Sequence, residues 1–422
     1  MNFIINRIFF VFFLLIPLKL NASDNLIEIQ SNISFYKISN NTSTWWQNNN
    51  NHGFDIEGSF ISSSMNISKK NVFFQNDFFY STHNKSFYSK YLNFNYQHSE
   101  KLNFMIGRFS RQFSNYLDDS LSSGSMLVST NAQPIPRLGV YYNNSLKKRP
   151  NISFKAGIAH GKFDSNKYYK DAPYLHEKFF YLINKKTNFE YGVGLVHEAM
   201  WSGHTILGKH TGKQPNSFKD FLKVFISADG PLREGEPHAN ALGNHLGIWD
   251  FYSIYHLSKF HLKFYYQHFF EDTSSFRFAN KTDGLWGIQF DSLNKNSGLL
   301  FEFLNTTNCC IDPPYQADNY YWNYQYRSGW RYKDNIVGNA FVNPINNDNN
   351  VKEKIKLAHV GAYFNTKNMK LHLLTSRKIH LSDSLKTKFN ITTKFNDNVY
   401  IDLLIFNKNK FTNYGLGLIY NF

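Results

Sequence analysis

The sequence predicts an all-β protein: a transmembrane antiparallel β-barrel of about 16 to 18 strands, with short helical or loop segments that occlude its lumen. Three observations lead to this fold class. The chain ends in an alternating aromatic strand, it begins with an export signal, and it combines many aromatic residues with a low mean hydropathy.

The carboxy-terminal segment 414–422 alternates large apolar side chains with other residues. Strand side chains point to opposite faces with a period of two, so one face would carry all of the large ones. A barrel closes on its first strand because lipid offers no water to an unpaired strand edge. We therefore interpret five residues as a membrane-assembly signal for the barrel-assembly machinery: Tyr414, Leu416, Leu418, Tyr420 and Phe422.

Residues 1–23 have the features of a cleaved secretory signal peptide. Arg7 supplies a positive charge, an apolar run follows it, and small residues end the segment at Ala22 and Ser23. The rest of the chain has no stretch near the roughly 18 apolar residues that a helical span needs. We therefore expect residues 24–422 to form a single barrel domain in the bacterial outer membrane, with internal plug-like insertions and extracellular loops.

The composition fits a barrel better than a soluble core. Aromatic residues make up 18% of the chain, with 42 Phe and 27 Tyr, while the mean hydropathy is only −0.45. In a barrel, lipid-facing residues alternate with polar lumen residues, and aromatic girdles mark both membrane interfaces. A low-GC genome that enriches Phe and Tyr is an alternative source of part of this excess.

The charge balance points to an anionic partner. The chain has 46 Lys and Arg against 31 Asp and Glu. Export argues against nucleic acid and favours outer-membrane lipid, lipopolysaccharide phosphates or an acidic polysaccharide. A basic surface that is only solvated is the open alternative.

The two cysteines are adjacent, at Cys309 and Cys310, and precede Asp312 in a segment that reads as a loop. Two cysteines cannot form a disulfide framework or a tetrahedral metal set. A vicinal disulfide and an incidental pair both remain open. We expect no metal and no cofactor.

Alternating segments recur along the chain with turn residues between them. Residues 87–97 and 102–106 read as a hairpin joined by a short polar turn. In 259–270, Phe260 and Phe264 share one face and Lys263 lies on the other. Similar runs are predicted at 152–158, 189–195, 284–291, 299–304, 356–364, 369–375 and 399–406.

Three segments do not alternate well: 109–136, 162–186 with a helix-like stretch at 173–181, and 201–225. Irregular backbone cannot face lipid. We therefore predict that these segments form plug or constriction elements and long loops. Residues 343–352 read as an exposed loop tip.

The motifs that would indicate an enzyme are incomplete. Gly203 to His210 has the glycine and lysine spacing of a P-loop, but His210 replaces the hydroxyl residue that holds magnesium. His197 and Glu198 begin like a zinc-protease helix, but Trp201 stands where the second histidine should be. We interpret this pair as lumen-facing and do not expect an enzyme, although a barrel-embedded lipid-modifying enzyme stays open.

Several blocks in order together resemble the capsule-assembly Wzi family of outer-membrane proteins. The blocks contain glycine, aromatic and small polar residues, and they span most of the mature chain. They are 106–108, 129–137, 175–178, 194–203, 243–250, 283–287, Glu302, 319–322 and 329–330.

This resemblance implies an 18-stranded barrel that is occluded by helical segments. It also implies that the protein binds exported capsular polysaccharide, holds it at the cell surface, and acts as a lectin-like attachment protein and not as a catalyst. The alternative is a porin-like channel for small anionic solutes, with selectivity from a basic lumen.

Saccharide sites combine exposed aromatic rings with planar hydrogen-bonding groups, and Arg or Lys recognises uronate or phosphate. Each candidate tryptophan could instead belong to an interface girdle. The predicted polysaccharide-binding set is Arg137, His197, Glu198, Trp201, His245, Trp249, Asp250, Trp322, Arg327, Trp330 and Arg331.

Overall fold

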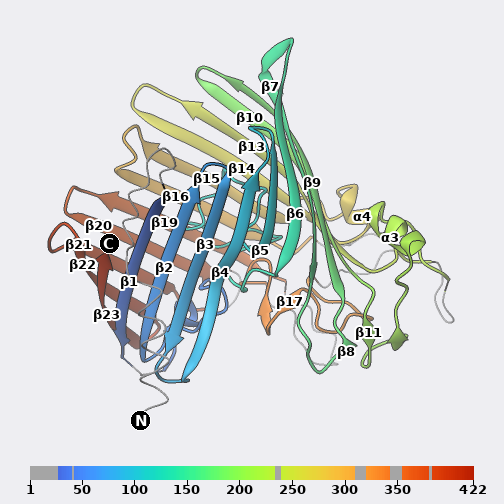
Figure 1. Cartoon of the computed structure of the whole chain (residues 1–422), viewed down its shortest axis with the longest axis horizontal. Helices are drawn as coiled ribbons and strands as arrows, with labels where there is room; N and C mark the ends of the chain where they lie inside the picture. The colour runs from blue at the N-terminus through green and yellow to red at the C-terminus, as the bar shows by residue number, and fades with distance from the viewer. Residues whose placement is uncertain (1–26, 40–41, 233–238, 309–319, 343–353, 380–382) are drawn as a thin grey trace.

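The computed structural model describes residues 27–39, 42–232, 239–308, 320–342, 354–379 and 383–422. Within them, eighteen antiparallel strands form one closed sheet, which confirms the predicted fold class (Figure 1). Each barrel strand pairs with the next barrel strand in the chain, and the last strand pairs with the first.

The barrel strands are β1 (Glu28–Ile38), β2 (Ser59–Lys69), β3 (Val72–Ser81), β4 (Ser86–Gln97), β5 (Leu102–Arg108), β6 (Arg137–Leu146), β7 (Arg149–Lys162), β9 (Tyr174–Lys186), β10 (Phe189–Trp201), β13 (Asn244–His256), β14 (Phe260–Phe270), β15 (Gly284–Ser292), β16 (Ser297–Asn305), β19 (Lys356–Asn365), β20 (Met369–Lys378), β21 (Lys386–Lys394), β22 (Val399–Lys408) and β23 (Phe411–Asn421).

The closing contact joins β23 to β1. Leu418 lies opposite Phe35 in the register. Beyond the strand, the backbone N–H of Phe422 donates to the carbonyl oxygen of Ser31 at 3.0 Å. Closure leaves no strand edge open to lipid, as the carboxy-terminal alternation predicts.

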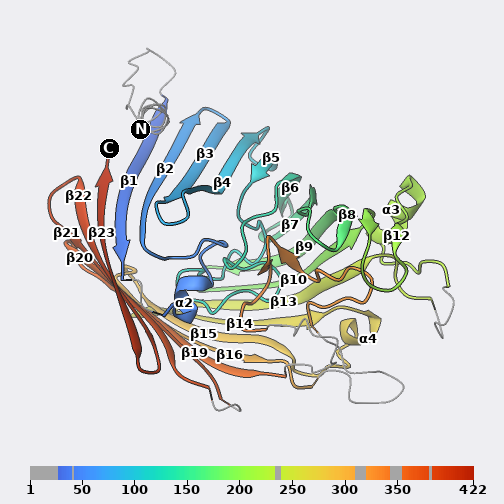
Figure 2. The same ribbon diagram turned by 90° about the horizontal axis from the view of Figure 1, so that it is seen from below.

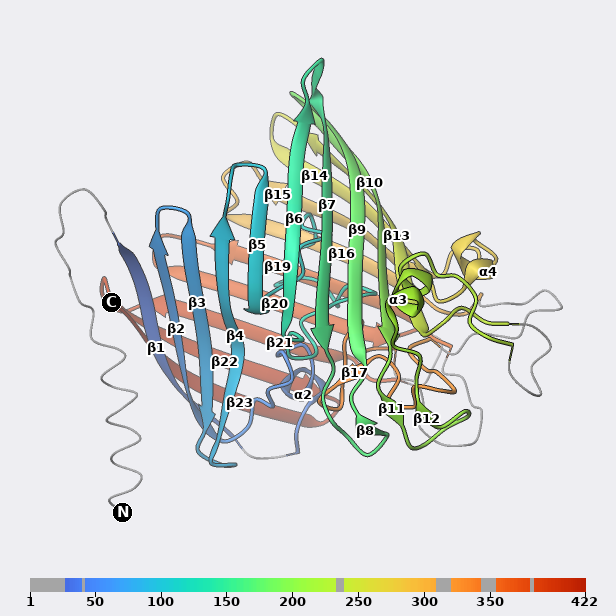
Figure 3. The same ribbon diagram turned by 45° about the vertical axis from the view of Figure 1, so that its right-hand side comes forward.

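The two ends of the barrel differ in the length of their connections (Figure 3). At one end, short turns such as 70–71, 147–148 and 187–188 join the strands. At the other end, long segments such as 109–136 and 202–243 leave the sheet. Outer-membrane barrels have short periplasmic turns and longer extracellular loops, so the long-loop end faces the cell exterior.

The side chains alternate between an apolar outer face and a polar lumen. On β23, Leu416 is 60% exposed on the outer face. On β14, Phe264 is exposed on the outside, whereas Lys263 points inward and donates to the carbonyl oxygen of Tyr116 at 2.6 Å. This pattern confirms the strand at 259–270.

The helix-like reading of 173–181 is wrong, because these residues form most of strand β9. Leu175, Glu177 and Phe179 face the packed interior, while His176 and Lys178 lie on the opposite face. Both faces carry large or charged side chains, so the polar and apolar alternation that marks a strand is lost.

The remaining elements are short and lie in the long connections. No helix among the described residues is long and apolar enough to cross a membrane. These elements are helices α2 (Trp45–Asn48), α3 (Phe218–Phe225) and α4 (Thr273–Phe276), a small sheet of β8 (Tyr169–Asp171), β11 (His204–Thr205) and β12 (Gly212–Lys213), and a two-stranded sheet of β17 (Arg331–Tyr332) and β18 (Asn335–Ile336).

Three expectations lie outside the described residues: the signal peptide at 1–23, the Cys309–Cys310 pair and the loop tip at 343–352.

The closing strand gives a direct test of lipid contact. Leu418→Lys should destabilise the folded barrel by about 2–4 kcal/mol, because it places a charge on the lipid-facing surface. Thr412→Lys, next to the extracellular turn on the same face, should cost about 0–1 kcal/mol. Urea-dependent unfolding in lipid vesicles measures both values, and equal losses would contradict the expectation that Leu418 lies deeper in the lipid than Thr412.

Candidate functional site

The lumen is filled by the connection between β5 and β6, residues 109–136, which we call the plug. Figure 2 shows this segment and α2 inside the ring of strands. The buried carboxylate of Asp250 on β13 holds one part of the plug. It accepts a hydrogen bond from Ser114 Oγ at 2.5 Å and another from the Tyr116 hydroxyl. Tyr181 on β9 donates to the same carboxylate at 2.5 Å.

A second carboxylate, Glu302 on β16, holds the next part of the plug. Its oxygens accept from Ser122 Oγ and from the backbone N–H of Ser123, both at 2.6 Å. The side-chain oxygen of Gln267 accepts from the backbone N–H of Met126 at 2.9 Å. Side chains from separate strands therefore fix the plug across the lumen.

The extracellular segment 320–342 covers the plug. The Tyr321 hydroxyl donates to the carbonyl oxygen of Met126 at 2.6 Å, and Asn339 Nδ2 donates to that of Gly124 at 2.6 Å. The plug is thus held by the barrel wall on its sides and by this segment from outside, and the expectation that 109–136 is a plug element is confirmed.

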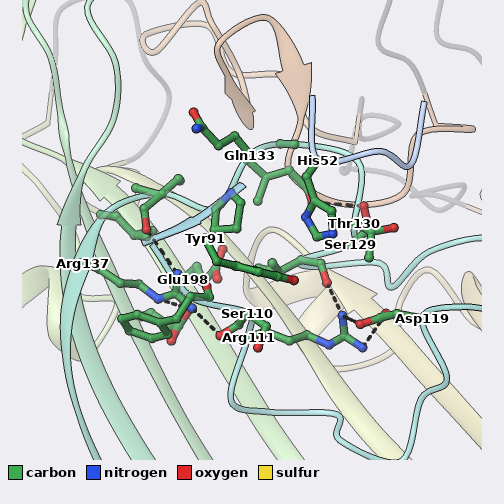
Figure 4. A pocket seen from close by; sticks show the side chains of 18 residues that line it. His52, Tyr91, Ser110, Arg111, Asp119, Ser129, Thr130, Gln133, Arg137 and Glu198 are labelled. Atoms are coloured by element: carbon green, nitrogen blue, oxygen red, sulfur yellow. Dashed lines mark hydrogen bonds and ion pairs between the residues drawn. The ribbon is translucent and has the colours of Figure 1, made fainter. Parts of the chain in front are cut away.

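A polar pocket lies between the plug and strands β6, β9 and β10 (Figure 4). Arg137 Nε lies 3.7 Å from Glu177 Oε2, and its guanidinium also donates to the Phe109 and Ser110 carbonyl oxygens at 3.1 and 3.0 Å. Glu198 lies opposite Glu177 in the β9–β10 register. One arginine therefore faces two buried carboxylates.

The other wall of this pocket comes from connections between strands. Arg111 pairs with Asp119, with Nη2 and Oδ1 2.8 Å apart. Burial lowers the pKa of Arg111, but the Asp119 carboxylate and other nearby anionic groups outweigh burial and leave it above its usual value. Burial, together with the charges of Lys90 and Arg111, holds the pKa of His52 well below its usual value.

This pocket is too small for a sugar. Its volume is about 40 Å³, which is room for roughly one to three water molecules. A larger lumen cavity of about 520 Å³ is lined by the basic side chains of Lys90, Lys370, Lys388 and His372. The contacts that hold the plug, made by Asp250, Glu302 and Gln267, do not depend on either cavity.

The extracellular end carries a second group of residues, which we call the rim platform: Lys167, Tyr168, Lys209, Trp322, Tyr324 and Arg327. Each aromatic ring has a cation over it. The distances from the cationic centre to the ring centroid are 5.3 Å for Lys167 over Tyr168, 6.0 Å for Lys209 over Tyr324 and 5.3 Å for Arg327 over Trp322.

Backbone contacts place these pairs side by side. The Lys209 N–H donates to the Tyr324 carbonyl oxygen at 3.0 Å, and the Ile206 N–H donates to that of Tyr168 at 2.9 Å. Gly208, at φ 113°, lets the loop approach the Arg327 side chain, because a Cβ there would lie 2.7 Å from Arg327 Cγ. The three rings are partly exposed, while Lys167 and Lys209 are exposed.

The comparison with family models assigns the chain. Residues 121–346, more than half of the sequence, match the model described as capsule assembly protein Wzi. The chain belongs to the Wzi family. It is therefore an outer-membrane barrel of a capsule-assembly family.

No curated protein matches the Wzi-family chain. Among solved structures, a triple mutant of the Rhodopseudomonas blastica porin is 8% identical with a TM-score of 0.39, and the match covers 94% of this chain and 100% of the porin. The Salmonella typhi OmpF complex with daunomycin is 10% identical with a TM-score of 0.40, and the match covers 94% and 98%. Likenesses at this level assign no function.

The structure divides the predicted site residues of this Wzi-family protein into three groups. Arg137, Glu198 and Asp250 face the lumen and hold or surround the plug. The outer wall carries His197, Trp201, His245 and Trp249. The segment over the plug carries Trp322, Arg327, Trp330 and Arg331.

Only Trp322 and Arg327 among these residues belong to the rim platform. Trp330 is fully buried, and Arg331 Nη1 donates to the Asp334 carbonyl oxygen at 2.9 Å. The reading of His197 and Glu198 as a lumen-facing pair is wrong for His197, which lies on the outside beneath α3. Neighbouring strand residues must point to opposite faces. A binding role for the eleven residues stays a prediction.

Sequence reasoning missed the other rim residues and the two plug contacts made by Gln267 and Glu302. Lys167, Tyr168, Lys209 and Tyr324 lie in three different connections, so no local pattern joins them. Glu302 belongs to one of the blocks that resemble the Wzi family but is not in the predicted site set, although a lone carboxylate on an apolar strand is a usable signal for a buried contact.

The plug contacts predict how the lumen would open. Asp250→Ala would remove the acceptor of two buried hydroxyls, Ser114 and Tyr181, and of the partly buried Tyr116 hydroxyl, at about 1–3 kcal/mol for each buried group left unsatisfied. We expect easier plug release, measured as a rise in planar-bilayer conductance and faster trypsin cleavage at Arg111. Asp291→Ala, a lumen carboxylate bonded to Tyr363 at 3.1 Å, is the matched control, and an equal rise in both variants would exclude Asp250 as a plug anchor.

Proposed function

We propose that this protein binds exported capsular or related anionic surface polysaccharide and anchors it to the cell surface. The observation that carries the proposal is the rim platform, in which three aromatic and cation pairs lie together at the extracellular end of a plugged barrel. Aromatic rings pack on the apolar faces of sugars, and Lys or Arg binds uronate or phosphate.

The proposed role is lectin-like attachment without catalysis. A polymer binds at an open surface more readily than in a closed cavity, and the rim platform projects from the loops above the plug. Within the described ranges, no group of three or more His, Cys, Asp or Glu side chains is arranged to hold a metal ion. The proposal needs neither a metal nor a cofactor.

The porin-like alternative rests on the basic cavity of about 520 Å³ in the lumen. Basic lumen residues favour anions, whereas the anchored plug favours a closed barrel. Planar-bilayer recording separates these functions: a closed wild-type pore that binds polymer fits attachment, and a steady anion-selective current would contradict it.

The rim platform predicts which substitutions weaken polymer binding. Arg327→Ala should weaken binding to anionic polysaccharide by roughly ten-fold or more, because loss of a charged hydrogen bond costs about 1.5–3 kcal/mol and ten-fold is about 1.4 kcal/mol. Trp322→Ala should also weaken binding, because it removes the ring that packs on a sugar face. Surface plasmon resonance with purified capsule measures the change. Lys410→Ala, an exposed lysine outside the platform, should bind as the wild type does.

Gene deletion tests the function in the cell. Polysaccharide should move from the cell-bound fraction to the medium, because synthesis continues while attachment is lost. Quantifying the glycan in both fractions measures this shift. The attachment role fails if cell-bound glycan is unchanged and none appears in the medium.

The route to the membrane is part of the proposal. We infer a signal peptide at 1–23 that is removed on export, and a mature single-domain barrel at 24–422. The five outward-facing residues of the carboxy-terminal segment would then be read by the barrel-assembly machinery, which the exposed row from Tyr414 to Phe422 supports.

A further inference from the structure

Helix α3 lies against the outer wall of the barrel at its extracellular end (Figure 3). Val224 is fully buried in a small apolar cluster with Ala199 of β10 and Leu242. The Phe221 ring centroid lies 5.6 Å from that of Trp201. This cluster is separate from the main core inside the barrel.

Beneath α3 runs a row of outward-facing histidines: His160, His176, His197 and His245. His197 Nε2 lies 2.8 Å from His245 Nδ1, and the rings of His160 and His176 stack at 4.9 Å. The rings of Phe221 and Phe225 cover His176, which is fully buried and has no hydrogen-bond partner among the described residues. The helix therefore covers His176, whereas His160 at the edge of the row stays exposed.

The barrel covers only part of the apolar surface of α3. At 100° per residue, Val224, Phe221 and Phe225 form the sector that faces the wall. Phe218, Leu222 and Ile226 form the adjacent sector and are 74, 48 and 71% exposed. The third sector carries Lys219, Asp220 and Lys223.

The apolar belt of the barrel begins directly beside this helix. Lys178 of β9 lies 4.2 Å from the centroid of the Phe225 ring. Two residues further along the same outer face, Phe180 is 52% exposed, and Leu182 follows at 51%. Two strand residues span about 7 Å, so α3 lies at the upper boundary of the lipid-facing surface.

We propose that α3 and Lys178 form a binding site for the phosphorylated glycolipid of the outer leaflet, lipid A. A helix at a membrane interface places its apolar side among acyl chains and its lysines at the headgroups. Here Phe218, Leu222 and Ile226 contact the acyl chains, while Lys178, Lys219 and Lys223 bind the phosphates. The site goes beyond polysaccharide attachment and does not depend on it.

The site also accounts for an eight-residue helix. Isolated helices of this length are marginal in water. Ser217 caps α3 by accepting from the Asp220 N–H at 3.2 Å, and Asp220 accepts in return from the Ser217 N–H at 2.9 Å. Packing of Val224, Phe221 and Phe225 against the barrel wall stabilises one apolar sector of the helix. Lipid contact with Phe218, Leu222 and Ile226 would stabilise the other.

The test measures lipid binding by the full-length protein in detergent, by native mass spectrometry. Diphosphorylated lipid A should bind the wild type at least ten-fold more tightly than dephosphorylated lipid A. K219A/K223A should remove most of this difference, and F218S/L222S/I226S should weaken both lipids. Excess inorganic phosphate should not displace lipid A, because the acyl chains supply part of the affinity.

Two control variants carry the same kinds of side-chain change as the α3 variants but at positions far from α3. Lys410→Ala removes another exposed extracellular lysine, and Phe395→Ser removes a 72% exposed phenylalanine at the other end of the barrel. Both should bind lipid A as the wild type does. The proposal fails if the α3 variants bind lipid A as the wild type does, or if the control substitutions weaken lipid A binding equally. It also fails if the wild type binds phosphorylated and dephosphorylated lipid A equally well, and this comparison requires no variant. Altered self-association in place of altered lipid binding would assign α3 to a protein contact instead.

Discussion

The requirement that every backbone polar group be paired within the bilayer governs this structure. It forces the last strand, β23, to meet β1, and it confines irregular backbone to the lumen or to the extracellular end. Eighteen strands enclose a lumen too wide for wall side chains alone to fill. The plug is the consequence, and its Ser side chains and backbone N–H groups reach carboxylates and an amide on the surrounding strands.

A filled lumen moves the functional surface outward. Residues that read as ligand-binding from their chemistry, such as Asp250 and Arg137, are occupied by contacts with the plug and neighbouring backbone. The cations and aromatics of the rim platform are instead joined through backbone contacts between loops. The same end of the barrel also carries α3, so the polymer and lipid sites proposed for this protein are both placed outside the membrane core.

The sequence predicted the barrel well because alternation is a local property. The runs around Phe264 and Leu416 show the polar and apolar contrast that lipid imposes. Alternation failed at β9, where Glu177 and Phe179 contact the packed interior and His176 lies under α3. The candidate site was harder to predict, because contacts such as Tyr324 with Lys209 join distant loops. The direction in which His197 points depends on strand register, which composition does not encode.

The position of the plug in the chain sets an order of events during biogenesis. The plug follows β5, yet its partners Asp250, Gln267, Glu302 and His359 lie on β13, β14, β16 and β19. These contacts can form only after the four strands have joined the sheet, although the two ends of the plug are already held by its neighbours β5 and β6. Anchoring of the plug is therefore a late step of assembly, which depends on strands that lie more than a hundred residues further along the chain.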